Sequence, residues 1–182
     1  SRAVLNAVQK VYGARLAWYF LKVDQRSYVV YPRLAYLDKY RGEAVVSIVS
    51  GNDDVIWDTM TPESRKSWSR RKLLEYADYY ITGDGKAGRL VELLEAGSYI
   101  VFHAHWNSLW SNDARHGLEV MEEVLKRINT LLRNRVLWMK LSEIACYYAA
   151  SRTLDIHVDK SPDRLRVFMD NRFPCADLTV SF

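Results

Sequence analysis

Two histidines, two residues apart, are the clearest candidates for chemistry in this sequence. His103 and His105 follow Tyr99–Phe102, an apolar run with the length and composition of a strand. Side chains two residues apart on a strand point to the same side, so both imidazoles should face one site. Two imidazole nitrogens can hold Zn²⁺, and one imidazole can act as a general acid. We therefore predict His103 as a general acid and both histidines as ligands of a divalent metal. Local hydrogen bonding and capping of the next turn are the alternative roles.

Carboxylates follow two other predicted strands. Asp53 and Asp54 come after Val45–Val49, and Asp84 comes after Tyr79–Thr82. Carboxylates at strand ends suit acid–base catalysis or the binding of hard metal ions. We predict Asp53 and Asp84 as catalytic residues and Asp54 as a metal ligand. A loop cap and an Asx-turn are the alternatives, because aspartate is also a common turn residue.

Tryptophans and asparagines lie close to these positions in the sequence. If the substrate is a sugar, as the family resemblance described below implies, its apolar C–H faces can stack on an indole, and its hydroxyls can bond to side-chain amides. The predicted substrate-binding residues are Trp57, Trp106, Asn107, Trp110 and Asn112. Core packing is the alternative role for each tryptophan.

Three glycines spell a dinucleotide-binding fingerprint. Gly83, Gly85 and Gly88 read G-x-G-x-x-G between an apolar run and a helical pattern. The fingerprint requires an acidic residue about twenty positions further on, to bind the ribose. This sequence has Phe102–His105 there, so we interpret the glycines as a tight turn into a helix. Nucleotide binding through these glycines remains an alternative.

The order of apolar patterns predicts the fold. The five runs of strand length are Leu16–Lys22, Val45–Val49, Tyr79–Thr82, Tyr99–Phe102 and Val136–Met139. The helical patterns are a short one that ends before Gly13, then Pro32–Tyr40, Pro62–Ala77, Ala87–Glu95, Ala114–Leu132 and a last one after Ser142. Alternating strands and helices predict a parallel α/β fold, and ligands bind beyond the carboxyl ends of such strands.

The spacing of apolar residues changes after residue 150. Apolar and polar residues alternate in Thr153–Asp159, and Arg164–Met169 and Asp177–Phe182 have a similar pattern. This period is typical of half-exposed strands. We predict a barrel-like domain over 1–150, and a β-strand-rich extension, the start of an antiparallel β-domain, over 151–182.

Composition limits the class of protein. The 182 residues are 49% hydrophobic and carry a net charge of +4, which describes a globular chain with a mildly basic surface. That charge is small for a nucleic-acid binder, so we predict no nucleic-acid partner. The sequence contains neither a signal peptide nor a membrane-spanning run, so we expect a soluble chain without membrane contact. It begins inside a helical pattern without methionine, as expected for part of a longer protein.

Two motifs resemble the polysaccharide deacetylase superfamily. Gly97–His103 precedes a long helical pattern and then Val136–Ile144. The family similarly ends with a Gly-Ser, an aliphatic strand and a histidine, then a helix and a last strand that runs into a Leu-Ser-Glu-type helix start. The resemblance implies a (β/α) barrel that acts on acetylated sugars through a divalent metal, with His103 in the position of the catalytic acid. The family's Asp pair in its usual context and its His-x-x-x-His are not recognisable here.

Together with these residues, the resemblance implies a carbohydrate-active hydrolase, of deacetylase or glycoside hydrolase type, built on the C-terminal half of a parallel (β/α) barrel. Its partner would be a carbohydrate substrate and its cofactor a zinc ion, and it could be inactive as a fragment. A non-catalytic carbohydrate-binding module is the alternative function, and a nucleotide-binding α/β domain is the third. The sequence indicates neither the sugar, the bond, the oligomeric state nor the compartment.

Overall fold

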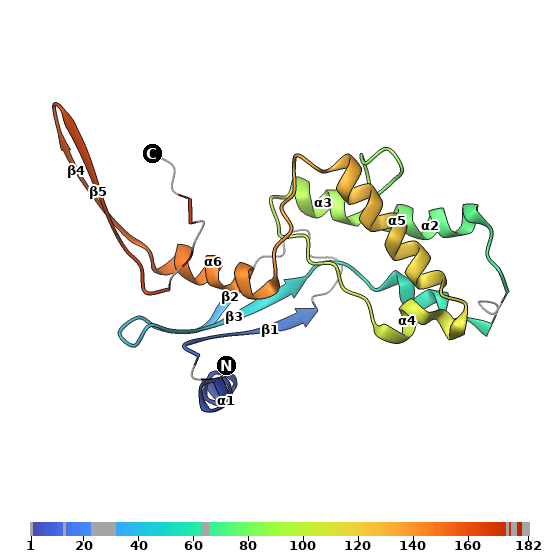
Figure 1. Ribbon diagram of the computed structural model, residues 1–182, viewed down its shortest axis with the longest axis horizontal. Helices are drawn as coiled ribbons and strands as arrows, with labels where there is room; N and C mark the ends of the chain where they lie inside the picture. The colour runs from blue at the N-terminus through green and yellow to red at the C-terminus, as the bar shows by residue number, and fades with distance from the viewer. Residues whose placement is uncertain are drawn as a thin grey trace. The chain divides into compact units, whose positions relative to one another are not determined.

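A computed structural model of the protein describes residues 2–12, 14–22, 32–62, 66–173, 175 and 178–179. Over these residues the chain is a mixed α/β structure of helices and two small sheets (Figure 1). In chain order the elements are α1 (Arg2–Tyr12), β1 (Leu16–Lys22), β2 (Arg33–Asp38), β3 (Glu43–Ser50), the 3₁₀ helix η1 (Val55–Thr59), α2 (Arg70–Tyr80), α3 (Arg89–Glu95), α4 (Trp106–Trp110), the 3₁₀ helix η3 (Ser111–Asp113), α5 (His116–Leu131), α6 (Leu141–Thr153), β4 (Asp155–Ser161) and β5 (Arg164–Asp170). The described strands do not close into a barrel.

The described residues form two compact units. Unit 1 takes its residues from Ser1–Leu21, Pro32–Ile48 and Met139–Phe182, and unit 2 takes its residues from Lys22–Tyr31 and Val49–Trp138. The domain boundary predicted at residue 150 falls inside α6 and stays a prediction. All the predicted site residues belong to unit 2, so their positions can be compared directly.

The larger sheet is built around a buried strand. Strand β3 lies between β1 and β2, pairs antiparallel with β2, and points the same way as β1 in Figure 1. It is buried from Ala44 to Ser50, as its continuous apolar sequence predicts for a central strand. In unit 1, Leu5 of α1 packs against Ala17 and Val45, so the apolar face of α1 covers this part of the sheet.

The second sheet is a two-stranded hairpin in unit 1. Strands β4 and β5 pair antiparallel from Asp155↔Asp170 to Ser161↔Arg164, and most of their side chains are exposed. This confirms the strands predicted within 153–169. Most of the predicted strand Asp177–Phe182 lies outside the described residues. Among the helices that the structure describes, none combines the length and the apolar composition needed to cross a bilayer.

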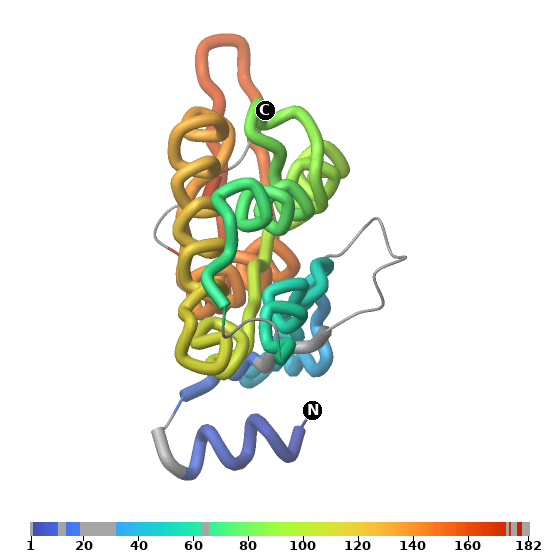
Figure 2. The backbone as a smooth tube through the Cα atoms, turned by 90° about the vertical axis from the view of Figure 1, so that its right-hand side faces the viewer, coloured from blue at the N-terminus to red at the C-terminus, as the bar shows by residue number. Residues whose placement is uncertain are grey.

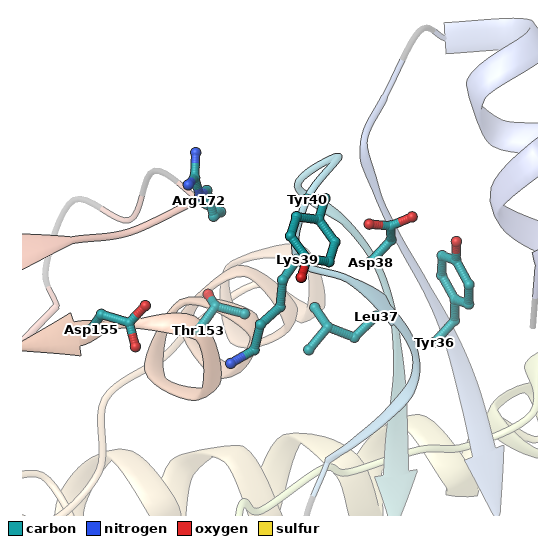
Figure 3. A pocket seen from close by; sticks show the side chains of 8 residues that line it. All are labelled: Tyr36, Leu37, Asp38, Lys39, Tyr40, Thr153, Asp155 and Arg172. Carbon is teal, nitrogen blue, oxygen red and sulfur yellow. The ribbon is translucent and has the colours of Figure 1, made fainter.

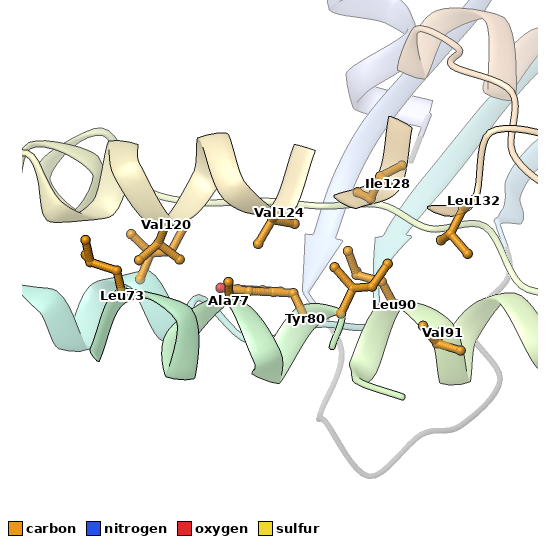
Figure 4. Close-up of a cluster of buried hydrophobic side chains, with 11 residues drawn as sticks. Leu73, Ala77, Tyr80, Leu90, Val91, Val120, Val124, Ile128 and Leu132 are labelled. Atoms are coloured by element: carbon orange, nitrogen blue, oxygen red, sulfur yellow. The ribbon is translucent and has the colours of Figure 1, made fainter. Parts of the chain in front are cut away.

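The core of unit 2 lies between α2 and α5 (Figures 2 and 4). Leu73, Ala77 and Tyr80 lie on one face of α2, and they meet Val120 and Val124 of α5. Their spacing of three or four residues is that of an amphipathic helix. Each of these side chains is at most 7% exposed, so burial of apolar surface holds the two helices together.

A buried arginine joins the same two helices. Arg127 of α5 is 6% exposed, bonds Asp78 of α2 at 2.6 Å and Glu123 at 3.0 Å, and donates to the Ile81 carbonyl at 2.6 Å. Arg70 of α2 also pairs with Glu123. Burial alone would raise the pKa of Glu123, but the bonds from the two arginines outweigh burial and lower it. The network therefore stabilises the charged form of Glu123.

Two of the predicted elements are wrong in type. The predicted helix Pro32–Tyr40 is instead strand β2, because pairing with the buried strand β3 overrides its local helical pattern. The predicted strand Tyr79–Thr82 is the last turn of α2 and the residues after it. Helix α2 begins at the N-cap Ser69, whose side chain accepts a hydrogen bond from the Lys72 amide, and the apolar residues at its end are its core-facing side chains.

Two other predicted strands lack regular secondary structure. Tyr99–Phe102 and Val136–Met139 are not part of either sheet that the described residues form. Val101 is buried, and Phe102 and Val136 pack against the core of unit 2, which explains why these runs are apolar. The described residues confirm a mixed α/β structure, and the parallel barrel remains a hypothesis.

Candidate functional site

The His103 ring is held by a serine at the end of β3. Ser50 is fully buried, and its Oγ lies 2.8 Å from His103 Nδ1, 2.9 Å from Asn52 Oδ1 and 3.0 Å from the Val101 carbonyl. The two carbonyl oxygens can only accept, so we assign the hydroxyl proton to one of them and the Nδ1–H tautomer to His103, which then donates to Ser50. This arrangement turns His103 Nε2 away from Ser50 and fixes the plane of the ring.

The His105 ring is held by a buried carboxylate. Asp54 Oδ2 accepts from His105 Nδ1 at 2.6 Å, from the His105 backbone amide at 2.9 Å and from Ser108 Oγ at 3.2 Å. The Asp54 side chain is 5% exposed, whereas that of His105 is 60% exposed. Asp54 therefore fixes the Nδ1–H tautomer from the protein side and leaves Nε2 of an exposed ring for proton exchange. Among the described residues, Asp54 Oδ1 is buried without a hydrogen-bond partner.

The two rings share one site with Trp57. The His103 and His105 ring centroids are 6.1 Å apart, and Trp57 and His105 make an edge-to-face contact with their centroids 5.1 Å apart. Trp57 lies on η1, directly after the loop that carries Asp54. The structure thus brings together four of the predicted site residues, which come from two segments about fifty residues apart in the sequence: His103, His105, Asp54 and Trp57.

Tyr80 is a positioning residue that the sequence reasoning missed. It is fully buried, its hydroxyl donates to the Asp53 carbonyl at 3.0 Å, and it accepts from the Val55 amide at 2.9 Å. These bonds clamp both sides of Asp54. Burial raises the pKa of Tyr80 far above its ordinary value, so the hydroxyl remains a donor. The sequence pattern places Tyr80 in a strand, and only its position on the core-facing side of α2 indicates this role.

The side chains of Asp53 and Asp84 bond to residues outside the group formed by His103, His105, Asp54 and Trp57. Asp53 is buried, and its side chain hydrogen-bonds Tyr79, whose pKa is raised by burial first and by this carboxylate as well. Asp84 closes its own turn, accepting from the Thr82 hydroxyl at 2.7 Å and from the Lys86 amide at 3.1 Å. The hydrogen bond from Thr82, followed by that from Lys86, lowers the pKa of Asp84. These contacts are those of a buried loop residue and an Asx-turn.

The glycine fingerprint has a structural explanation. Gly85 and Gly88 have φ of 70° and 104°, which favour glycine. A Cβ at Gly88 would lie 2.7 Å from the Tyr80 carbonyl, so the chain approaches itself too closely for any side chain. The motif also follows helix α2, not the strand that a dinucleotide-binding turn requires.

An aromatic pair follows His105 directly in the chain. Trp106 and Trp110 of α4 stack with centroids 6.0 Å apart at 15°, and Trp106 is 72% exposed. Trp110 Nε1 donates to Asp113 Oδ1 at 2.8 Å, and the Arg115 guanidinium lies over the Trp110 ring. Trp110 is therefore fixed, and it supports an exposed indole. The two predicted amides, Asn107 and Asn112, are also exposed on this segment.

The metal prediction concerns His103, His105 and Asp54. Both imidazoles bond to the protein through Nδ1, which is how second-shell groups orient metal-binding histidines. Zinc sites need three or four protein ligands, however, and the described residues contain no group of three or more His, Cys, Asp or Glu able to hold a metal. The described residues therefore do not fit a complete zinc site, and zinc stays a prediction.

One cavity formed by the described residues lies in unit 1. It measures about 620 Å³ and is lined by residues that include Asp38, Lys39, Asp155 and Arg172 (Figure 3). Its charged groups have both signs, so it has no clear preference for an anion or a cation. None of the predicted site residues lines it.

Comparison of the chain with models of protein families, with curated proteins and with solved structures found no match.

Proposed function

We propose that this protein is a carbohydrate-active hydrolase of the deacetylase type, in which His105 and Asp54 form the proton-transfer pair. The observation that carries the proposal is the 2.6 Å bond between His105 Nδ1 and the buried Asp54 carboxylate. A buried acceptor behind an exposed imidazole is the arrangement that orients a general base for catalysis. His103, the general acid that the resemblance to the deacetylase family implies, remains part of the proposal.

Removal of an acetyl group from a sugar needs a base and an acid. Water must lose a proton as it attacks the acetyl carbonyl, and the departing sugar oxygen or nitrogen must gain one. His105 Nε2 has a free lone pair while Nδ1–H donates to Asp54, so His105 is the base. His103, when protonated at Nε2 as well, is the acid, and Ser50 holds its ring in both states.

The tryptophans support a sugar as the substrate. Trp106 presents an exposed indole face immediately after His105 in the chain, and Trp110 holds it from behind. Indole faces bind the apolar C–H surface of a pyranose, and neighbouring amides bind its hydroxyls. Trp57 is half exposed beside the His105 ring, where it would contact the substrate group nearest the reaction.

The proposal is tested by acetate release from acetylated xylan and chitin oligosaccharides, with and without added zinc. We expect His105→Gln and Asp54→Asn to lower kcat by about 10²- to 10⁴-fold with little change in KM. Asp84→Asn is the matched control, because Asp84 closes an exposed turn. Acetate release that survives His105→Gln unchanged would refute the role of His105.

A non-catalytic carbohydrate-binding module is the second candidate. The observation that favours it is the exposed Trp106 on its Trp110 support, which needs no acid or base to bind a sugar. Calorimetric titration with the same oligosaccharides separates the two functions. Binding lost in Trp106→Ala and retained in His105→Gln, with no acetate released by wild type, would establish the module.

We also propose that the chain contributes to a larger parallel (β/α) barrel. Support comes from β1 and β3, which point the same way in one sheet, and from the motifs within 97–144 that resemble the deacetylase superfamily. An experimental structure of the longest natural form of the protein tests this hypothesis. Further strands parallel to β3 would support it, and a sheet that ends at β1 and β2 would contradict it.

A further inference from the structure

The chain returns to helix α6 after the β4–β5 hairpin. Asn171 Oδ1 accepts from the Phe173 amide at 3.1 Å and lies 3.3 Å from the hydroxyl of Thr153, the last residue of α6. Phe173 is 3% exposed. Asn171 and Phe173 are therefore packed in unit 1, and the two ends of the hairpin are held near the C-terminal end of α6.

This return brings the two cysteines of the chain together. Cys146 lies in the middle of α6, and Cys175 follows Phe173 by two residues. Their thiols are within hydrogen-bonding reach of each other. Both residues are partly exposed, so a small redox reagent can reach them. Proximity of the sulfurs and access for an oxidant are the two conditions for a disulfide, and the sequence alone indicated neither.

We propose that Cys146 and Cys175 form a reversible disulfide that fastens the base of the β4–β5 hairpin to α6. In the reduced state this connection depends on the side chains of Asn171 and Phe173. In the oxidised state a covalent bond closes the loop from Cys146 to Cys175, which contains the whole hairpin. The hairpin has two strands and mostly exposed side chains, so it is marginally stable by itself. A covalent bond at its base would therefore stabilise it.

The bond forms by exchange with a low-molecular-weight disulfide such as oxidised glutathione. One cysteine thiolate attacks this disulfide, a mixed disulfide forms and one glutathione thiolate leaves. The second cysteine thiolate then attacks the protein sulfur of the mixed disulfide, and the second glutathione leaves. The cysteine pair is oxidised, glutathione disulfide is reduced, and the two cysteine protons are taken up by the two glutathione thiolates. Burial, and then the adjacent Cys175, raise the pKa of Cys146, so we expect exchange to accelerate as pH rises.

The test uses the full chain, reduced and then equilibrated in glutathione buffers with an increasing oxidised share. Intact-mass spectrometry should show the loss of two hydrogen atoms with no glutathione adduct, and dithiothreitol should reverse it. We expect the oxidised protein to have a Tm about 5–10 °C above that of the reduced protein, because the bond closes a long loop.

Cys146→Ser and Cys175→Ser are the matched controls. Each leaves a single thiol, which should end as a glutathione adduct without the oxidant-dependent rise in Tm. Wild type that stays reduced, carries two adducts or forms dimers between chains would overturn the proposal. The mass measurement is made on wild type, so it decides the question even where a serine variant fails to fold.

Discussion

Two histidine–aspartate pairs in different regions of the molecule have almost the same bond length and very different surroundings. In unit 2, His105 Nδ1 lies 2.6 Å from Asp54, whose side chain is 5% exposed. On the β4–β5 hairpin, His157 Nε2 lies 2.8 Å from Asp159, and these side chains are 75% and 57% exposed. The Asp54 carboxylate also accepts from a backbone amide and from Ser108, whereas the hairpin pair joins two neighbouring positions of one exposed strand.

The comparison shows that burial and additional bonds distinguish a preorganised pair, whereas distance does not. Water competes for both partners of an exposed pair, and such pairs contribute little to stability. Three donors surround Asp54 Oδ2, so any rotation of this buried carboxylate would break several hydrogen bonds at once. We therefore expect substitutions in the pair of unit 2 to have large effects and substitutions in the hairpin pair to have small ones.

The largest difference should appear in catalysis, if the proposed function holds. We expect Asp54→Asn to lower kcat for acetate release by about 10²- to 10⁴-fold, because an amide does not hold His105 in the productive tautomer. Asp159→Asn should leave kcat unchanged. Acetate release measured at saturating substrate checks both expectations. Equal losses in the two variants would remove the distinction between the pairs.

A second large effect concerns the buried arginine of unit 2. Arg127→Met leaves Glu123 partly buried with one arginine fewer and leaves the Ile81 carbonyl without its donor. We expect a loss of about 3 kcal/mol in the free energy of unfolding. The control is Arg172→Met, because Arg172 pairs with Asp170 at 3.8 Å and both side chains are more than half exposed. Urea denaturation should show no change for this control, and similar losses in both would contradict the argument from burial.

Tyr80→Phe tests the clamp on Asp54 without changing the core volume. The substitution removes the hydroxyl between the Asp53 carbonyl and the Val55 amide, and we expect it to cost about 1–2 kcal/mol. Tyr40→Phe is the matched control, because Tyr40 is fully exposed. Chemical-shift changes at the His105 imidazole would show that the clamp positions the pair. A loss of stability with an unchanged His105 spectrum would limit Tyr80 to a structural role.

The prediction from sequence succeeded for elements whose hydrophobic pattern matches their burial in the folded structure. Helices α1 and α5 and the hairpin strands have a clear hydrophobic period of their own, and all of them occur close to the predicted positions. Strand β2 and the end of α2 were predicted wrongly because tertiary contacts decide them. Arg33–Asp38 is extended by pairing with β3, and the aromatic run at Tyr79 and Tyr80 is apolar because it faces the core.

The candidate site was predicted in part for a similar reason. Residue type and strand-end position were enough to select His103, His105 and Asp54, which the structure places together. The sequence did not indicate which carboxylate meets which histidine, because that depends on how the segment after β3 lies against 101–105. The hydroxyls of Ser50 and Tyr80 carried no sequence signal, since both residues are ordinary in a strand or a helix.

The pH dependence of stability should also separate buried from exposed pairs. The lowered pKa of Glu123 means that its charged form stabilises the folded state above its ordinary pKa, and this contribution is lost as pH falls through the folded pKa. We expect Glu123→Gln to reduce the loss of stability between about pH 7 and about pH 3. The control is Glu75→Gln, whose partner Arg71 is 89% exposed. Urea midpoints across this range measure the effect, and identical slopes for wild type and Glu123→Gln would contradict it.

The smallest expected effect concerns the hairpin pair and completes the comparison. In a double-mutant cycle of His157→Asn and Asp159→Asn, we expect a coupling energy of about 0–0.5 kcal/mol, because water replaces each lost partner. The same cycle with His105→Asn and Asp54→Asn should give about 1.5–3 kcal/mol, since burial of the Asp54 carboxylate hinders water from replacing its donor. Unfolding free energies of the single and double variants provide both values. A hairpin coupling as large as that in unit 2 would mean that bond length decides the strength of a pair, whatever its burial.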